Sequence, residues 1–199
     1  SLHDALPILN AAVSTGRLPG GFAFDFRYNY GKTDGYIRNA WVNLNSALAS
    51  ASWSNGNHLV KFNFLHGLQH SGITWEGVSA EQMAADRRYN PAGEYVDSQG
   101  RIRYYDNQSD NYLQNHYQLV HVGLLSDRLT LSTTLNYTDG GGYYESYKDK
   151  AVDYISRKIS SADYFAGASN LKYRDENTEA IFNLAYSRYC GRHYGQVIW

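Results

Sequence analysis

A run of alternating aromatic and polar residues constrains the fold of this chain more than any other feature. Between residues 22 and 30, every second residue is Phe or Tyr, and the residues between them are Ala, Asp, Arg and Asn. Side chains of a β-strand point alternately to the two faces of a sheet, whereas a helix would spread these aromatics around its circumference. The segment therefore predicts a strand with one apolar and one polar face.

The same alternation recurs along the chain, so several strands are expected. The aromatic content of 15% and the 18 glycines also suit strands and turns better than helices. With the segment above, the pattern gives about eight strands. The further strands are expected at residues 9–15, 42–53, 60–64, 112–125, 128–138, 162–173 and 179–187.

The predicted connections between these strands alternate in length. Short turns rich in Gly, Asn and Asp are expected at residues 16–20, 54–57, 126–128 and 174–177. Longer polar loops are expected at residues 31–41, 71–111 and 139–161. Short turns on one rim and long loops on the other are typical of bacterial outer-membrane barrels.

We therefore expect an all-β fold, an antiparallel up-and-down meander of about eight strands that forms an incomplete part of a transmembrane β-barrel. On this interpretation the apolar residues Phe22, Phe24, Phe26, Leu129, Leu131, Leu135, Phe182 and Leu184 share a lipid-facing side. Alternation alone also fits a soluble cell-surface β-sandwich that acts as a binding module. Aromatic residues near strand ends favour the barrel: Tyr28, Tyr30, Trp41, Trp53 and Tyr137.

Charge, cysteine and terminal features narrow the class further. A net charge of −1 with scattered Lys and Arg argues against binding to nucleic acid. The single cysteine, Cys190, cannot form an intrachain disulfide. Residues 1–8 look like a translated sequencing adapter, so residues 9–199 are interpreted as the partial barrel and both ends as cut.

The sequence offers no convincing catalytic or metal-binding motif. Four residues along a strand separate His66 from His70 by about 13 Å, too far for one metal ion. The segment 106–111 lacks the glycine and glutamate of a calcium loop, and Gly140–Gly142 lacks the lysine and serine of a phosphate-binding loop. Without a nucleophile elbow or a His, Ser and acid cluster, we expect neither an enzyme nor a cofactor.

Several segments in order along residues 10–199 resemble the barrel domain of TonB-dependent outer-membrane receptors. The match is carried by residues 32–39, 88–95, 104–112, 114–119, 135–148 and 191–199. The resemblance implies a barrel of about 22 strands, closed by an N-terminal plug and energised through TonB acting on a short N-terminal box. Neither plug nor box is recognised in this sequence, so we expect a fragment from the early to middle part of the barrel.

The resemblance also implies location in the outer membrane of a Gram-negative bacterium and uptake of a scarce nutrient: chelated iron, a cofactor or a glycan. The expected partners are outer-membrane lipid, a small nutrient ligand and, through the missing N-terminal part, TonB. Loop residues with planar or cationic side chains are candidates for ligand binding, and the alternative is that they only order the long loops. These candidates are Trp75, Arg87, Arg88, Tyr89, Arg103, Tyr104, Tyr105, Tyr143, Tyr144 and Tyr147.

Overall fold

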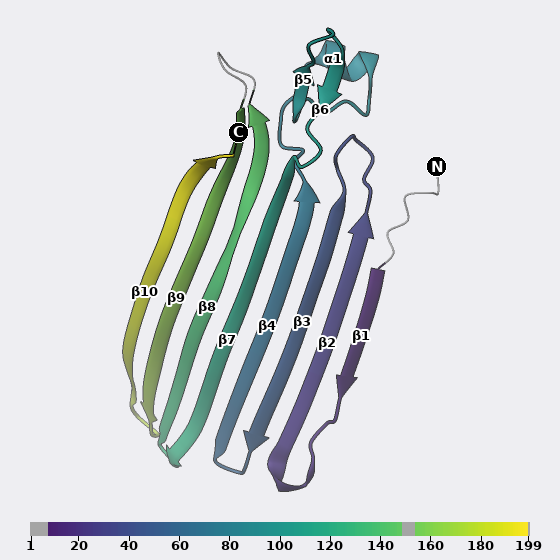
Figure 1. Ribbon diagram of the computed structural model, residues 1–199. Helices are drawn as coiled ribbons and strands as arrows, with labels where there is room; N and C mark the ends of the chain where they lie inside the picture. Colours follow the sequence, from purple (N-terminus) through teal and green to yellow (C-terminus); the bar gives the residue numbers. More distant parts are fainter. Residues whose placement is uncertain (1–7, 149–153, 199) are drawn as a thin grey trace.

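The computed structural model describes residues 8–148 and 154–198 and is dominated by one large antiparallel sheet (Figure 1). Its eight strands lie in the order β1-β2-β3-β4-β7-β8-β9-β10. Each strand of this sheet therefore pairs with the strands that come before and after it in sequence, and β4 pairs with β7 across the insertion between them. The predicted all-β meander of about eight strands is confirmed. The strands are β1 (Ile8–Ser14), β2 (Phe22–Thr33), β3 (Val42–Ser54), β4 (His58–Gly72), β7 (Ser109–Ser126), β8 (Leu129–Lys148), β9 (Tyr154–Arg174) and β10 (Glu179–Val197).

The four predicted short turns lie together on one rim of the sheet (Figure 1). The first contains a 3-10 turn, η2 (Pro19–Gly21), and the others join β3 to β4, β7 to β8 and β9 to β10. The opposite rim carries the loop 34–41 and a long insertion at residues 73–108. That insertion holds a helix, α1 (Ala80–Ala85), and a small hairpin of β5 (Glu94–Val96) and β6 (Ile102–Tyr104).

The prediction of a long loop at residues 139–161 is wrong. Strand β8 continues to Lys148 and β9 starts at Tyr154, while residues 149–153 lie outside the described residues. Gly140–Gly142 is therefore part of a strand, paired with β7 on one side and β9 on the other. A Cβ added at Gly142 would lie 1.9 Å from the carbonyl oxygen of Asn111. Glycine lets β7 approach closely here, and two-sided pairing overrides its weak intrinsic strand preference.

Two other predicted boundaries also move. Strand β7 begins at Ser109, so the expected loop 71–111 shortens to the insertion, and residues 31–33 belong to β2. Most of the segment interpreted as adapter, residues 1–7, lies outside the described residues, whereas Ile8 begins β1.

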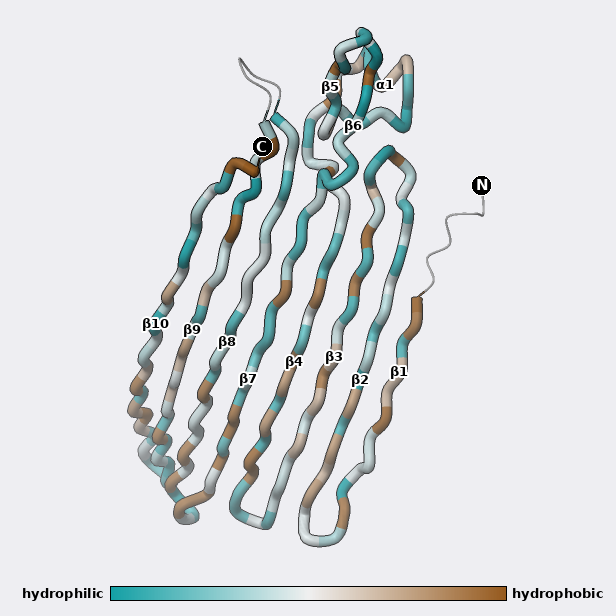
Figure 2. The backbone as a smooth tube through the Cα atoms, viewed as in Figure 1, coloured by the Kyte–Doolittle hydropathy of each residue, from teal (hydrophilic) through white to brown (hydrophobic). Residues whose placement is uncertain are grey.

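The strand register gives the sheet two chemically different faces. Phe24 lies opposite Ala51, which lies opposite Phe62, and the row continues through Leu119 and Leu135. Because directly opposite residues point to the same side, these residues share one face, here called the apolar face. The register places all eight predicted apolar residues on this face, and Figure 2 shows apolar residues recurring along the strands.

The other face, here called the polar face, carries cross-strand hydrogen bonds between amide side chains. Asn63 Nδ2 donates to Gln118 Oε1 at 2.9 Å, and Gln118 Nε2 donates to Asn136 Oδ1 at 3.0 Å. The row links β4, β7 and β8. A face of this composition suits contact with water or with a polar partner.

The described residues form almost no internal hydrophobic core. Phe22, Phe24 and Phe26 are each 46% exposed, and the buried apolar residues in the described ranges are Ile73 and Ala92, both in the insertion. The second sheet in the described part of the chain is the short β5–β6 hairpin, which lies at the rim (Figure 1). The apolar face of the large sheet is thus left open.

Candidate functional site

The insertion 73–108 is attached to the sheet by a buried asparagine. The side chain of Asn90, 2% exposed, donates at 2.9 Å to the carbonyl oxygens of Arg38 and of Ile73. Its own Oδ1 accepts the backbone N–H of Ala92 at 3.1 Å. One side chain therefore satisfies groups from the loop before β3, from the first residue of the insertion and from its middle, which fixes their relative position.

A second attachment point is Glu145 in β8, which is 2% exposed. Its Oε1 accepts hydrogen bonds from the Tyr105 hydroxyl and from Asn107 Nδ2, while Oε2 pairs with Arg157 at 2.7 Å. Burial, together with the hydrogen bond to Glu145, raises the pKa of Tyr105 to about 12. Tyr105 therefore anchors the insertion as a neutral donor at physiological pH.

Arg38 forms a third attachment point that sequence reasoning missed. Its guanidinium carbon lies 3.3 Å from the centroid of the Tyr104 ring, and its Nη2 donates to the carbonyl oxygen of Ala92 at 3.2 Å. Burial lowers the pKa of Arg38 and raises the pKa values of Tyr89 and Tyr104, both of which also interact with Glu94. Tyr89 and Tyr104 thus pack around this arginine inside the insertion.

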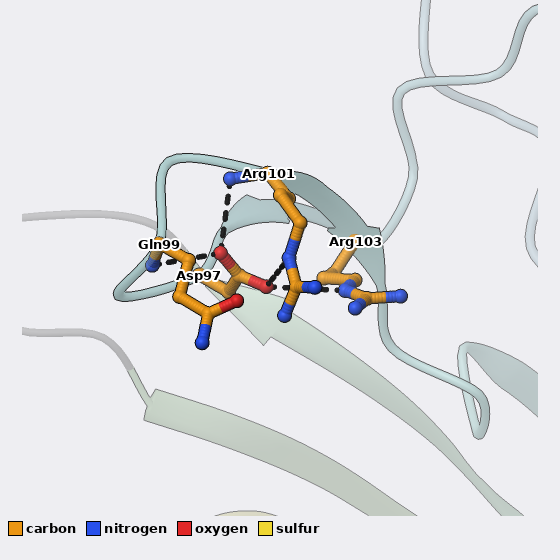
Figure 3. A network of polar contacts seen from close by, with 4 residues as sticks. All are labelled: Asp97, Gln99, Arg101 and Arg103. Carbon is orange, nitrogen blue, oxygen red and sulfur yellow. Dashed lines mark hydrogen bonds and ion pairs between the residues drawn. The ribbon is translucent and has the colours of Figure 1, made fainter.

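The hairpin of β5 and β6 is closed by Asp97 (Figure 3). Its carboxylate accepts the backbone N–H groups of Gln99 and Arg101 at 2.9 Å, and the Nε groups of Arg101 and Arg103 at 2.9 and 3.2 Å. The hydrogen bond from the backbone N–H of Arg101 is the main cause that lowers the pKa of Asp97. The guanidinium of Arg103 is therefore paired within the hairpin and is not free to bind a ligand by itself.

A groove of about 420 Å³ lies on the sheet close to the insertion. Alternation places its side chains from four strands mainly on the polar face: Asp110, Tyr112, Tyr144, Lys158, Ser160 and His193. Gly142 and Gly195 also line it and leave room because they lack side chains. His193 is held by Ser160 Oγ at 2.8 Å and by the Tyr189 hydroxyl at 3.1 Å.

Trp75 joins the insertion to this groove. Its ring contacts the ring of Tyr144 edge-on, with centroids 5.6 Å apart and planes at 88°, and the Trp75 side chain remains 58% exposed. Two predicted candidates from distant parts of the sequence, Trp75 and Tyr144, are thus brought together. A third, Tyr143, borders the groove with its backbone, because alternation places its ring on the other face, where Arg157 lies 4.8 Å from the ring centroid. The groove combines aromatic rings with one lysine, Lys158, and one carboxylate, Asp110, and can hold a planar ligand that carries charged groups.

The remaining candidates are separated from this groove. Arg88 donates to the carbonyl oxygen of Tyr36 at 2.8 Å, Tyr147 packs on Tyr95 at 5.0 Å between centroids, and Arg87 is exposed. Tyr143, Tyr144 and Tyr147 were predicted in a loop, but all three belong to β8. The alternation that could have revealed them is interrupted by the three glycines before them.

Lys158 and His193 were not predicted as site residues. Lys158 lies within the range expected to be loop, and His193 has no sequence neighbour that suggests a function. The described ranges contain no group of three or more His, Cys, Asp or Glu side chains placed to hold a metal ion. The helices of these described ranges are all too short or too polar to span a lipid bilayer.

The sequence matches no protein-family model and no curated protein. Solved structures do share its fold. The ferric-catecholate import receptor Fiu from E. coli K12 aligns with a TM-score of 0.64 at 14% identity in its open form and 0.67 at 13% in its closed form. BauA, the ferric preacinetobactin receptor from Acinetobacter baumannii, aligns with a TM-score of 0.68 at 13% identity.

These alignments cover almost all of this chain and a minor part of each receptor. The shares are 96%, 96% and 95% of this chain, against 35% and 32% of the two Fiu structures and 31% of BauA. The chain therefore spans about one third of the length of these receptors. Its eight-stranded meander has the fold of part of a transmembrane β-barrel.

Proposed function

We propose that this chain is part of an outer-membrane receptor that takes up a scarce nutrient with energy delivered through TonB. The open apolar face is the observation that carries the proposal. Burying the remaining surface of a half-exposed phenylalanine such as Phe24 contributes about 1–2 kcal/mol, and lipid can supply that burial without a second sheet. The polar face, with its row of hydrogen-bonded amides, suits the lumen of the barrel.

The alternative is a soluble β-sandwich that binds ligands at the cell surface. A sandwich buries the inner faces of two sheets against each other. In the described residues the second sheet is a hairpin with strands of three residues, too small to cover the apolar face. The exposure of Phe22 and Phe26 therefore favours the membrane interpretation.

A test of the membrane interpretation uses two neighbouring residues of β7, Gln118 on the polar face and Leu119 on the apolar face. Each is replaced by cysteine in a Cys190→Ser background of the full-length receptor in outer-membrane vesicles, and each is spin-labelled. We expect the label at 119 to be accessible to oxygen and the label at 118 to a water-soluble nickel chelate. If oxygen and the nickel chelate reached the labels at the two positions equally well, the proposal would be contradicted.

For the nutrient, we propose a chelated iron complex as the first cargo to test, before a cofactor or a glycan. The two receptors that share the fold are described as receptors for ferric catecholate and for ferric preacinetobactin. Catechol-type groups are planar and their ferric complexes are anionic, so Trp75 and Tyr144 would stack on rings and Lys158 would pair with charge. The activity is binding and gated passage rather than catalysis.

The cargo is tested by uptake of radiolabelled iron into cells that express the full-length receptor, with and without TonB. We expect uptake of a ferric catecholate to require TonB, and Lys158→Gln to raise the concentration for half-maximal uptake several-fold. Lys172→Gln is the matched control, because Lys172 pairs with Glu179 at 3.1 Å near the rim of short turns. Iron uptake that persists without TonB, or equal effects of the two variants, would contradict this assignment.

A further inference from the structure

The rings of His58 in β4 and His121 in β7 lie next to each other on the same face of these two paired strands. Nδ1 of His58 lies 3.2 Å from Nε2 of His121, and the two ring planes are 12° from parallel. Both side chains are partly buried. We propose that this pair is a two-histidine site for a divalent transition-metal cation such as Cu²⁺ or Zn²⁺. The inference depends on the register of β4 and β7 and not on the proposed uptake function.

The distance between the two nitrogens suits a shared metal ion. With metal–nitrogen bonds of about 2.0–2.1 Å, two imidazoles at angles between square-planar and tetrahedral have nitrogens about 2.9–3.4 Å apart. The observed 3.2 Å falls in this range. Imidazole is a preferred ligand of copper and zinc, and copper binds more tightly than zinc to a given set of nitrogens.

The space for this pair is created by Gly123. The register places His58 opposite Gly123 and His121 opposite Val60, so the two histidines are diagonal neighbours on the apolar face. A Cβ at position 123 would lie 2.7 Å from Nδ1 of His58 and 3.0 Å from Nε2 of His121. Any other residue would therefore press on both of the atoms that are proposed as ligands.

The backbone on either side of the pair is also held in place. Asn55 Oδ1 accepts the N–H of His58 at 2.7 Å, and the N–H of Leu124 donates to the carbonyl oxygen of Asn57 at 2.8 Å. These hydrogen bonds tie the turn before β4 to the end of β7. Because the backbone is held in place, only rotation of the two rings is needed to turn their facing nitrogens toward a shared ion, and little conformational entropy is lost on binding.

Without a metal, the two rings share one proton in an N–H···N hydrogen bond. Coordination requires a lone pair on both facing nitrogens, so the proton moves to the outer nitrogen of the same ring and no net proton is released. The pair lies at the rim of the short turns, because His58 is the first residue of β4. Water at this rim completes the coordination, since the described residues hold no third histidine, cysteine or carboxylate in a group with this pair. The site is therefore expected to bind more weakly than a zinc site with three or four protein ligands.

The test is electron paramagnetic resonance of Cu²⁺ added to the full-length protein in detergent, purified without a histidine tag. We expect hyperfine coupling to two imidazole nitrogens, and its loss in both His58→Asn and His121→Asn. A large excess of Zn²⁺ should displace the bound Cu²⁺ and remove this coupling. His70→Asn is the matched control, because His70 lies on the same strand and face but packs edge-on against Trp41 at 4.6 Å.

Gly123→Ala adds a variant that keeps both histidines. We expect at least tenfold weaker copper binding, because the added methyl group forces the rings apart, and unheated gels show whether the variant is folded. Coupling to a single nitrogen, an unchanged signal in a His58→Asn/His121→Asn double variant, or equal loss in His70→Asn would overturn the proposal. An unchanged copper affinity in folded Gly123→Ala would also overturn it.

Discussion

The hydroxyl of Tyr137 donates a hydrogen bond to Oδ1 of Asp163 at 3.0 Å, across β8 and β9 on the apolar face. Tyr28 makes the same kind of contact, donating to Asn45 at 2.8 Å. In both cases the polar partner of the tyrosine lies nearer the rim of the long loops. The rows of apolar residues lie on the opposite side of the tyrosine, toward the rim of the short turns. Tyrosines in this orientation are typical of the boundary between lipid and water.

The proposed location in a membrane predicts that the effect of a charge depends on its depth in the lipid. Leu119 and Tyr137 are both 41% exposed, but Leu119 lies inside the apolar rows and Tyr137 at their edge. If the face contacts lipid, Leu119→Arg should lower the free energy of unfolding by about 2–4 kcal/mol. Tyr137→Arg should lower it much less. Urea unfolding of the full-length protein in lipid vesicles measures both, and similar small effects would indicate a water-exposed face.

Removing the Tyr105 hydroxyl should loosen the insertion without affecting the sheet. Tyr105→Phe deprives the buried carboxylate of Glu145 of one donor, at a cost of about 1–3 kcal/mol. We expect faster hydrogen exchange across residues 73–108 and unchanged exchange in β7 and β8. Tyr36→Phe, at a side chain that is 58% exposed, is the control and should leave exchange unchanged.

The same contact predicts loosening of the insertion at alkaline pH. The pKa of Tyr105 is raised from its ordinary value of 10 to about 12, so the neutral phenol is favoured in the docked insertion. The contribution to stability is complete below pH 10 and is lost as the pH rises toward 12. Hydrogen exchange corrected for intrinsic rates should show this loss in the wild type. A Tyr105→Phe variant with the same pH dependence would contradict the assignment to Tyr105.

The hairpin of β5 and β6 should weaken at acidic pH. The pKa of Asp97 is lowered, mainly by the N–H of Arg101, so the hairpin is stabilised above the ordinary pKa of 3.8. This stabilisation is lost as the pH falls through the lower pKa of the folded state. Amide exchange at Gln99 and Arg101 should therefore increase in strong acid. In Asp97→Asn it should already be fast at neutral pH, and slow exchange in that variant would argue against the carboxylate.

Close packing of β7 against β8 should make Gly142 intolerant of a side chain. Gly142→Ala places a Cβ 1.9 Å from the carbonyl oxygen of Asn111, so the strands must separate or shift. We expect destabilisation of about 1–3 kcal/mol and a weaker ligand interaction in the adjacent groove. Gly67→Ala is the control, since its nearest neighbour would be 4.0 Å away. Equal urea midpoints for the two variants would refute the argument.

The strands whose two faces differ strongly could be predicted from sequence, and those with weaker contrast could not. Residues 22–30 alternate between aromatic and polar side chains, and the structure makes them a strand. Beyond Asp139 the alternation stops at three glycines, yet β8 continues because β7 and β9 hold it from both sides. That information lies in the pairing of strands and not in the local sequence.

Contacts between distant residues were beyond sequence reasoning for the same reason. His58 and His121 are 63 positions apart, and only the register of β4 and β7 brings their rings together. Trp75 was predicted as a candidate, but its contact with Tyr144 depends on the path of the insertion. Whether these candidates bind a ligand stays a prediction.

The insertion leaves the sheet at Gly72 and returns at Ser109, and these two residues are cross-strand partners. Its ends are therefore held side by side whatever lies between them, and the entropy of closing such a loop grows only slowly with its length. Residues 73–108 can be lengthened, shortened or replaced in evolution without disturbing the register of β4 and β7. Under the proposed function, exchange of this one segment would change the ligand that is recognised while the sheet stays the same.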